Sequence, residues 1–412
     1  MSIHGKDKVF PFILSIIGSV VLFWLVGCGE KLAPNGTGEN NAPDADILSP
    51  QPAPSTPLEE ALLIVSSTEG GSSTLTVANP DPGSLALIGN ISLGNGAVSG
   101  TVSENFYIVT QPKLDNAGLP KNGKEIQVYD LATPFPFTLI TDPPVQVGEQ
   151  QGGVLGAARD SSLGLTFISI YHEGAIAILD ETFTWRVSKS AGVNPSGIAV
   201  DEEHDRIFVV NTNAEGQGCG GTIASTISVF QCSAEAEEPA TSCKESGEPQ
   251  ETGGRNAFAI AYDASRGSVI VANYSDDNIA IWNVDVPISE EQPLEKIDLE
   301  KGAGPIALIL DSEGDRLFVV NQGNDSITSL QLGESTLEIE GTISFPAGTA
   351  PTSAAIRTTD STKTLYVTDN LENSITVCDI THFPSSADCN QKIFLGEGLQ
   401  PTSVQYYRGG NL

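Results

Sequence analysis

Cysteine is the residue type in this chain whose spacing points most directly to a chemical reaction. Cys232 and Cys243 are eleven residues apart, and so are Cys378 and Cys389. Each pair begins in a run of alternating apolar and polar residues, as in a β-strand. We therefore predict two disulfides that brace hairpins, each stabilising the fold by about 2 to 3 kcal/mol through loop entropy. Cys219 is left over, either as a free thiol or as the partner of another chain.

Cys28 closes the run Leu25-Val26-Gly27-Cys28, directly behind an apolar stretch near the N-terminus. Lys6 and Lys8 precede that stretch, so residues 1–27 have the layout of an export signal. The run resembles the lipobox of bacterial lipoprotein precursors, which implies removal of residues 1–27 and thioether lipidation of Cys28. The alternative is a membrane-spanning anchor, since the apolar stretch is long enough to cross a bilayer. Export also brings the other cysteines to a compartment where disulfides persist.

The segment behind Cys28 reads as a tether. Residues 29–58 contain six prolines among Gly, Asn, Ser and Asp, with too little apolar surface to form a core. Gly29, where some lipoproteins carry Asp, resembles enterobacterial lipoproteins that are sorted to the outer membrane. We therefore expect residues 28–58 to hold a domain on a bacterial cell envelope, attached to the outer membrane and facing the periplasm or the surface.

The chain is strongly acidic, with a formal net charge of -32 at pH 7. A field of that sign repels phosphate backbones and anionic lipid head groups, which excludes nucleic acid binding as a main activity. Two readings of the charge stay open. One is solubility or adaptation to salty surroundings, and the other is capture of a cation or recognition of a basic partner.

From Leu62 onward the sequence repeats, with an apolar strand that ends in Asn or Asp as the clearest element. The last three of these polar positions, Asn273, Asn321 and Asp369, are spaced by 48 and 48 residues. Seven copies of the strand fit: 63–66, 107–110, 167–170, 208–211, 269–273, 318–321 and 366–369. A second kind of strand precedes several copies, at 195–200, 305–310 and 351–356. With two further strands in each copy, the repeat has the length of a propeller blade.

The ends of the repeat region predict how the ring closes. The first copy lacks an inner strand, whereas residues 400–407 read as an inner strand with nothing after it. We therefore predict an all-β, seven-bladed β-propeller of four-stranded antiparallel blades, in which the C-terminal strand joins the first blade. Closure of this kind leaves no exposed sheet edge at the ends of the domain.

At these residues the chain resembles the YVTN family of β-propeller repeat proteins, and Tyr366-Val367-Thr368-Asp369 is the nearest match to the family's strand. The resemblance covers about residues 60–408, and it places a propeller domain at 59–412. Lactonase-like seven-bladed propellers and outer-membrane assembly propellers have similar repeats.

A propeller of this layout gathers several polar side chains on one face. Links from second to third strand and links between blades share that face, which includes the long links 111–124 and 212–225, while both cysteine pairs fall on the opposite face. The candidate binding residues on the first face are His172, Glu173, Asp276, Asp277, Asp325 and Glu372. Turn formation is the favoured explanation of each of these residues, because Asn and Asp accept hydrogen bonds from nearby backbone N–H groups.

The search for a catalytic set in the sequence gives little. The three histidines behind Cys28, His172, His204 and His382, lie in different copies and at no metal-ligand spacing. No Gly-x-Ser-x-Gly nucleophile elbow occurs. Ca²⁺ would need six to eight oxygens, and no complete Asp-x-Asp-x-Asp-Gly loop is present. We expect no cofactor, with Ca²⁺ as the one candidate ion.

The sequence thus favours a monomeric, lipid-anchored binding or scaffold module over an enzyme, with an unknown protein or small molecule as its ligand. The rival hypothesis is a cation-dependent lactone or ester hydrolase of the lactonase-like propeller type, which rests on analogy of fold. Carboxylates and a histidine converging on one point of the central axis would favour the enzyme.

Overall fold

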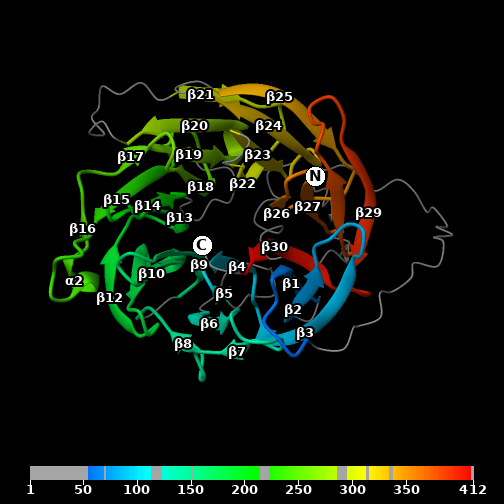
Figure 1. Ribbon diagram of the computed structural model, residues 1–412. Helices are drawn as coiled ribbons and strands as arrows, with labels where there is room; N and C mark the ends of the chain where they lie inside the picture. The colour runs from blue at the N-terminus through cyan, green and yellow to red at the C-terminus, as the bar shows by residue number, and fades with distance from the viewer. Residues whose placement is uncertain are drawn as a thin grey trace, which may run out of the picture.

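The computed structural model describes residues 54–68, 71–112, 123–149, 152–213, 222–284, 295–311, 315–333 and 337–409. Over these residues the chain forms seven antiparallel sheets arranged as blades around a central axis (Figure 1). The predicted seven-bladed β-propeller is confirmed. The predicted signal, Cys28, most of the tether and Cys219 lie outside the described residues. In the part of the chain described, no helix has the length and apolarity needed to cross a membrane.

Both ends of the propeller domain build blade 1. Its strands are, from the axis outward, β30 (Gln400–Arg408), β1 (Glu60–Ser67), β2 (Ser72–Asn79) and β3 (Ala86–Asn95). In Figure 1 the red β30 lies beside the blue β1, and the two strands pair antiparallel from Glu60 with Arg408 to Ser67 with Gln400. The predicted closure by the C-terminal strand is therefore correct.

The other six blades follow in chain order, each starting at the axis. Blade 2 holds β4 (Ser99–Ser103), β5 (Phe106–Gln111), β6 (Glu125–Asp130), β7 (Thr138–Leu139) and β8 (Val145–Gln146). Blade 3 holds β9 (Val154–Asp160), β10 (Leu165–Ile170), β11 (Ala175–Leu179) and β12 (Trp185–Ser190). Blade 4 holds β13 (Pro195–Asp201), β14 (Arg206–Asn211), β15 (Thr226–Gln231), β16 (Lys244–Glu245) and β17 (Gln250–Glu251), with the short helix α2 (Pro239–Ser242) before β16.

Blade 5 holds β18 (Ala257–Asp263), β19 (Ser268–Asn273), β20 (Asn278–Asn283) and β21 (Glu295–Asp298). Blade 6 holds β22 (Pro305–Asp311), β23 (Arg316–Asn321), β24 (Ser326–Leu332) and β25 (Leu337–Ser344). Blade 7 holds β26 (Ala354–Thr358), β27 (Lys363–Asp369), β28 (Ser374–Asp379) and β29 (Asp388–Phe394). In blades 2 and 4 the outermost position is shared by two short strands that pair with the same third strand.

The second strand of each blade is mostly apolar between its polar ends because both of its faces are buried. In β14, Ile207 and Val209 pack between blades 3 and 4, whereas Phe208 and Val210 pack between blades 4 and 5. Strands buried on both faces have near-continuous apolar sequences. The apolar strands that revealed the repeat are therefore the strands that pack against two neighbouring blades.

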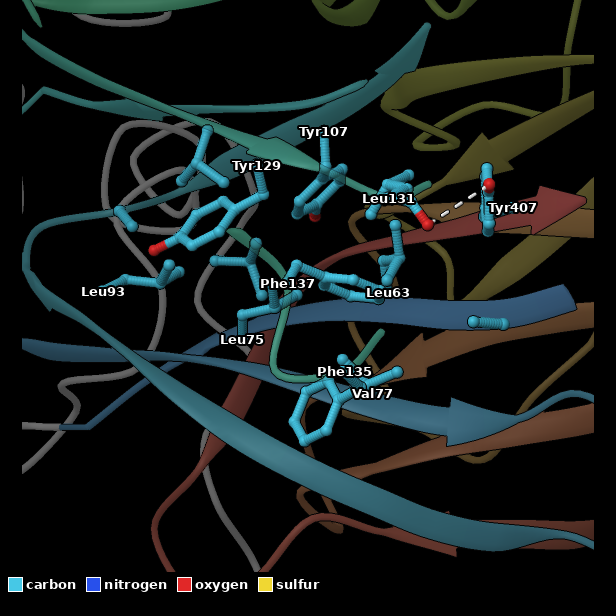
Figure 2. Packing of buried hydrophobic residues seen from close by; sticks show 14 residues of the cluster. Leu63, Leu75, Val77, Leu93, Tyr107, Tyr129, Leu131, Phe135, Phe137 and Tyr407 are labelled. Carbon is cyan, nitrogen blue, oxygen red and sulfur yellow. Dashed lines mark hydrogen bonds between the residues drawn. The ribbon is translucent and has the colours of Figure 1, made fainter. Parts of the chain in front are cut away.

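The core is divided into seven clusters, one at each interface between blades. Figure 2 shows the cluster between blades 1 and 2, where Leu63, Leu75 and Val77 of blade 1 face Tyr107 and Tyr129 of blade 2. The hydroxyl of Tyr407, on β30, donates a hydrogen bond to the backbone carbonyl of Leu131 at 3.5 Å (Figure 2). The closing strand is thus part of the apolar packing as well as of the sheet.

The inner strand of blade 7 begins later than the sequence predicts. The pattern places it at 351–356, but β26 starts at Ala354. The backbone N–H groups of Thr352 and Ser353 donate to the side-chain hydroxyl of Thr368, at 2.8 and 3.1 Å. These two N–H groups therefore donate to a side-chain hydroxyl, and not to a backbone carbonyl of β27 as in a regular pair of strands.

Both predicted disulfides are present, Cys232 with Cys243 and Cys378 with Cys389. The first joins the residue after β15 to the residue before β16, and the second joins β28 to β29. Each therefore spans the connection from the third strand of a blade to its fourth, which is the opposite face from the one that carries the links between blades.

Candidate functional site

The two ends of the propeller differ in the kind of connection they carry. We call the end with the links between blades and the second-to-third-strand turns the linker face. The other end carries the hairpins from first to second and from third to fourth strand, and we call it the hairpin face. All six candidate binding residues of the sequence lie on the linker face, in the turns after β10, β19, β23 and β27.

On the linker face, two of these carboxylates hold the links that leave their blades. Asp277 accepts hydrogen bonds from the backbone N–H groups of Gly302, at 2.7 Å, and Gly304, at 2.8 Å. Asp325 accepts from Gly348, at 3.0 Å, and Ala350, at 2.6 Å. Each carboxylate thereby satisfies two N–H groups of the connection to the next blade.

Two others hold the links that enter their blades. Glu173 accepts hydrogen bonds from the backbone N–H groups of Glu149, at 2.9 Å, and Gly152, at 3.2 Å. Asp276 accepts from the guanidinium of Arg255, at 2.6 and 3.0 Å. The hydrogen bond from Arg255 holds the pKa of the Asp276 carboxyl below its usual value.

The remaining two candidates contact side chains of their own blades. The carboxylate of Glu372 lies 3.0 Å from the ammonium group of Lys392 on β29. The ring of His172 packs edge-on against Tyr171, with 5.1 Å between ring centroids. Within the described ranges, no group of three or more His, Cys, Asp or Glu side chains is placed to hold a metal ion. Ligand binding on the linker face stays a prediction.

The hairpin face carries a feature that the sequence analysis did not find, a cavity of about 690 Å³ at the mouth of the central channel. We call it the axial cavity, and its lining comes from the inner strands β4, β9, β13, β18 and β22 and from the turns after β13 and β18. Much of the wall is aliphatic, with Ile198, Val200, Leu308 and Leu310 among its residues. Arg159, Asp201, Glu202, Glu203 and Tyr262 are its charged and aromatic residues.

Asp201 organises one part of the rim of the axial cavity. Its carboxylate accepts a hydrogen bond from Nε of Arg206 at 2.8 Å and lies 3.0 Å from Nδ1 of His204. Burial acts to raise the pKa of Asp201, but hydrogen bonds from Arg206, His204 and Tyr262 outweigh it and hold the pKa below its usual value. Asp201 is thus an anion with its partners in place, and His204 beside it is half-exposed.

Arg159 lies against two aromatic rings, and the carboxylates of Glu104, Asp160, Glu181 and Glu202 interact electrostatically with its guanidinium. Its guanidinium carbon lies 5.2 Å from the ring centre of Phe106 and 5.1 Å from that of Phe183. Nη1 donates to the hydroxyl of Thr166 at 3.0 Å and to the carbonyl of Gly164 at 3.4 Å, while the buried Nε has no hydrogen-bond partner among the described residues. Burial lowers the pKa of the guanidinium.

One sequence signal could have pointed to this rim. Asp160, Asp201, Asp263 and Asp311 end four successive inner strands, and all four are buried. Each is followed by a short hairpin, and only the hairpin after Asp201 contains a histidine. The repeated aspartate is explained by turn formation. The histidine, which occurs only in the hairpin of blade 4, is the signal that points to the rim of the axial cavity.

About half of the chain matches a known propeller family. Residues 179–382 match the family model described as Lactonase, 7-bladed beta-propeller. No curated protein matches the chain. The match runs from the end of blade 3 into blade 7 and includes the Asp201 cluster.

Solved structures agree in architecture at low sequence identity. A protein from Lactobacillus plantarum superposes with a TM-score of 0.62 at 13% identity, over 85% of this chain and 100% of the other. The periplasmic gluconolactonase of Pseudomonas aeruginosa gives 0.60 at 14% identity, over 84% and 98%. A putative 6-phosphogluconolactonase from Bacteroides uniformis gives 0.60 at 12% identity, over 85% and 100%. At these identities the likeness concerns the fold alone.

Proposed function

We propose that this protein is a ligand-binding module of the bacterial cell envelope, and that the axial cavity is where it binds a small molecule. The observation that supports the proposal is the cavity itself. Its volume of about 690 Å³ is in the range of roughly 300 to 1,000 Å³ found for small-molecule sites. Like those sites, it combines an aliphatic wall with a few polar groups at its rim.

The linker face offers less for a small molecule. Five of its six candidate residues have carboxylates, and each accepts a hydrogen bond from a link or pairs with a neighbouring cation. A ligand that competed for these groups would have to break bonds that hold one blade to the next. Recognition on that face would suit a larger partner that leaves the turns intact.

A cavity-filling variant tests the axial site. Ala261→Trp places an indole in the cavity wall, and Ala234→Trp adds the same ring to an exposed position on the hairpin face. Thermal-shift screening of a metabolite library against the full chain should yield ligands whose stabilisation is lost in Ala261→Trp and kept in Ala234→Trp. Ligands that stabilise both variants equally would place the site elsewhere.

The envelope location is the second half of the proposal, and it is supported by the run Leu25-Val26-Gly27-Cys28. Replacing Cys28 with Ala removes the thiol that would carry the lipid, so the variant should move from the membrane fraction to the soluble fraction on cell fractionation. Retention of Cys28→Ala in membranes would indicate a spanning segment.

Lactone hydrolysis is a second candidate function, favoured by the family match and by the Asp201–His204 pair. With Nδ1 directed at Asp201, Nε2 of His204 could take a proton from water, which attacks the lactone carbonyl. The ring C–O bond then breaks, and the proton passes to the leaving alkoxide. δ-Gluconolactone hydrolysis in a pH-stat should then fall at least about a hundredfold in His204→Gln and stay unchanged in His382→Gln. Equal rates in both variants would exclude His204 as the base.

A further inference from the structure

One buried aspartate on the hairpin face lacks the cation that its counterparts have. Four successive inner strands end in a buried aspartate, and three of these form an ion pair: Asp201 with Arg206 at 2.5 Å, Asp263 with Arg266 at 2.8 Å and Asp311 with Lys363 at 2.5 Å. The fourth, Asp160, is 0% exposed. Among the described residues it has no ion pair, and its Oδ2 has no hydrogen-bond partner. An uncompensated buried carboxylate costs free energy, because burial removes its hydration.

Comparison with blade 5 shows which cation is missing. Residues 160–164 (Asp-Ser-Ser-Leu-Gly) and 263–267 (Asp-Ala-Ser-Arg-Gly) form hairpins of the same length in blades 3 and 5. In both, the serine two residues after the aspartate donates to its Oδ1, at 2.7 and 2.6 Å. Arg266 also reaches Asp315 of blade 6 at 2.8 Å, so it bridges two carboxylates. Leu163 stands at the position of Arg266 and supplies no charge between blades 3 and 4.

The counterpart of Asp315 in blade 4 is Asp205, since each directly precedes the arginine that begins the second strand of its blade. Asp205 and Asp160 share one hydrogen-bond donor. The hydroxyl oxygen of Ser162 lies 2.7 Å from Oδ1 of Asp160 and 3.4 Å from Oδ1 of Asp205. A hydroxyl group has a single hydrogen to donate, so it cannot serve both carboxylates when both are ionised.

The surroundings of Asp160 favour its protonated form. Burial raises the pKa of the Asp160 carboxyl, and the negative charges of Glu202 and Asp205 act in the same direction. Hydrogen bonds from the hydroxyl of Ser162 and the backbone N–H of Leu163 oppose this rise without cancelling it. The pKa of Asp160 therefore lies above its usual value.

Two arginines lie close by, and neither pairs with Asp160. Arg159 interacts with it electrostatically, but its guanidinium donates to a carbonyl and a hydroxyl of blade 3 and lies against two phenylalanine rings. Arg206 is bound to Asp201, which His204 also contacts. The remaining charged side chains of this part of the rim are Glu104, Glu181 and Glu203. A proton is therefore the positive charge that Asp160 can take up in this place.

The hairpin that faces Asp160 is part of the rim of the axial cavity. Its Glu202 lines the cavity and accepts hydrogen bonds from Ser161, at 2.8 Å from the hydroxyl and 3.2 Å from the backbone N–H. With a proton on Oδ1, Asp160 donates to the oxygen of Ser162, and the hydrogen of Ser162 is then free for Asp205. Without that proton Asp160 keeps the hydrogen of Ser162, and three carboxylates repel one another across the two hairpins.

We propose that Asp160 is a proton-operated switch at the rim of the axial cavity. Its protonated form fastens the β9–β10 hairpin of blade 3 to the β13–β14 hairpin of blade 4, and its ionised form loosens this contact. The proton does here what Arg266 does between blades 5 and 6. The inference goes beyond ligand binding, because it describes how the rim of the cavity responds to pH.

Thermal unfolding of Asp160→Asn between pH 4 and pH 8 tests the switch. A raised pKa gives stability that is present at low pH and is lost as the pH rises through the folded value. Asp160→Asn cannot ionise, so its melting temperature should exceed that of the unmodified protein by about 2 °C or more at pH 8 and approach it at pH 4. The matched control Asp263→Asn loses an ion pair and should be less stable than the unmodified protein at pH 8. An Asp160→Asn variant that is no more stable at pH 8 would overturn the proposal.

Supplying the missing cation is a second, independent test. Leu163→Arg copies the hairpin of blade 5 and should remove most of the loss of stability between pH 4 and pH 8. Leu163→Met keeps an apolar side chain and should retain the full loss. The melting temperature at pH 4 shows whether each variant is folded. A folded Leu163→Arg variant with the pH dependence of the unmodified protein would contradict the role given to Asp160.

Hydrogen exchange of the Ser161 amide reports the contact between the two hairpins directly. Its protection factor, corrected for the intrinsic effect of pH, should fall at least about fivefold from pH 5 to pH 8 and stay constant in Asp160→Asn. His204→Gln should behave like the unmodified protein, and a constant protection factor in that variant would assign the switch to His204. Stabilisation by calcium chloride at pH 8 that is lost in Asp160→Asn would assign a metal ion in place of the proton. None of these measurements involves a ligand, so their outcome is separate from the binding function of the axial cavity.

Discussion

The ammonium group of Lys392 lies 2.7 Å from the buried carboxylate of Asp369, at the end of the second strand of blade 7. In blades 4, 5 and 6 the position of Asp369 is taken by Asn211, Asn273 and Asn321, whose amides donate to neighbouring side chains. In blades 4, 5 and 6 the side-chain amide of the asparagine is thus a hydrogen-bond donor at this position. In blade 7 an aspartate stands there, and the ammonium group of Lys392 on β29 is the donor.

This relationship predicts the result of a double-mutant cycle. Lys392→Met leaves Asp369 buried without its cation and should lower the free energy of unfolding by about 2 to 4 kcal/mol. Asp369→Asn combined with Lys392→Met restores the arrangement of the other blades and should recover at least half of that loss. Urea unfolding of the unmodified protein, the single variants Lys392→Met and Asp369→Asn and the double variant measures both effects. A double variant no more stable than Lys392→Met would contradict the comparison between blades.

Closure of the ring should depend on acidic pH through Glu60. Its carboxylate accepts two hydrogen bonds from Arg357 of blade 7, at 2.7 and 2.9 Å, and one from the hydroxyl of Tyr406 at 2.7 Å. The hydrogen bonds from Arg357 hold the pKa of Glu60 below its usual value in the folded protein. A lowered pKa contributes stability above the unfolded value, and that contribution is lost as the pH falls through the folded value.

Glu60→Gln should therefore lower stability by about 1 to 2 kcal/mol at pH 7, and the difference from the unmodified protein should shrink below pH 4. Thermal unfolding from pH 7 to pH 3 measures this convergence. The exposed Glu397→Gln is the control, and its difference from the unmodified protein should stay near zero. A constant deficit for Glu60→Gln across this pH range would argue against the ion pair as its cause.

The carboxylate of Asp325 should control the mobility of the link between blades 6 and 7. Asp325→Asn keeps a side chain that tolerates the positive φ of 53° but replaces one acceptor oxygen with a donor. One of the two N–H groups, of Gly348 or Ala350, then loses its acceptor, at a cost of about 1 kcal/mol. Hydrogen exchange of the link should be several times faster than in the control Asp360→Asn, which alters an exposed turn. Unchanged exchange would show that the carboxylate does not hold the link.

The disulfide of blade 7 should stabilise the protein by limiting the unfolded chain. Replacing Cys378 and Cys389 together with Ala should lower the free energy of unfolding by about 2 to 3 kcal/mol, as expected for a loop of this length. The variant should also lose part of its sensitivity to reductant, since one of the two described disulfides remains. Equal stability of the variant and the oxidised protein would contradict this role.

Particular residues show why the sequence predicts the ring better than the site. The second strand of every blade is buried on both faces, so its apolar run is visible in a single sequence. The predicted inner strand at 400–407 is followed by no further strand, so it has to pair with the first blade, which lacks an inner strand. The cysteine spacing fits a hairpin and gave the correct pairs.

The axial cavity follows no such local pattern. Its lining comes from five strands that begin between residues 99 and 305, and each contributes only a few residues. Residues of β9 and β22 both line it because blades 3 and 6 share an axis, which no spacing along the chain reveals. The roles of Asp277 and Asp325 were hidden for a related reason, since their partners are backbone N–H groups more than twenty residues away.

The pairing of β30 with β1 also sets an order of events in biosynthesis. Residues 60–95 supply three strands of blade 1, but the strand nearest the axis is the last one to be translated. Six blades can acquire all their strands while the first still presents an open edge on β1, and the circle of interfaces cannot be completed until residues 400–408 have reached the compartment in which the protein folds. Contacts of such sequence separation form slowly, so blade 1 is the part of the nascent propeller that is exposed longest to proteases and to chaperones.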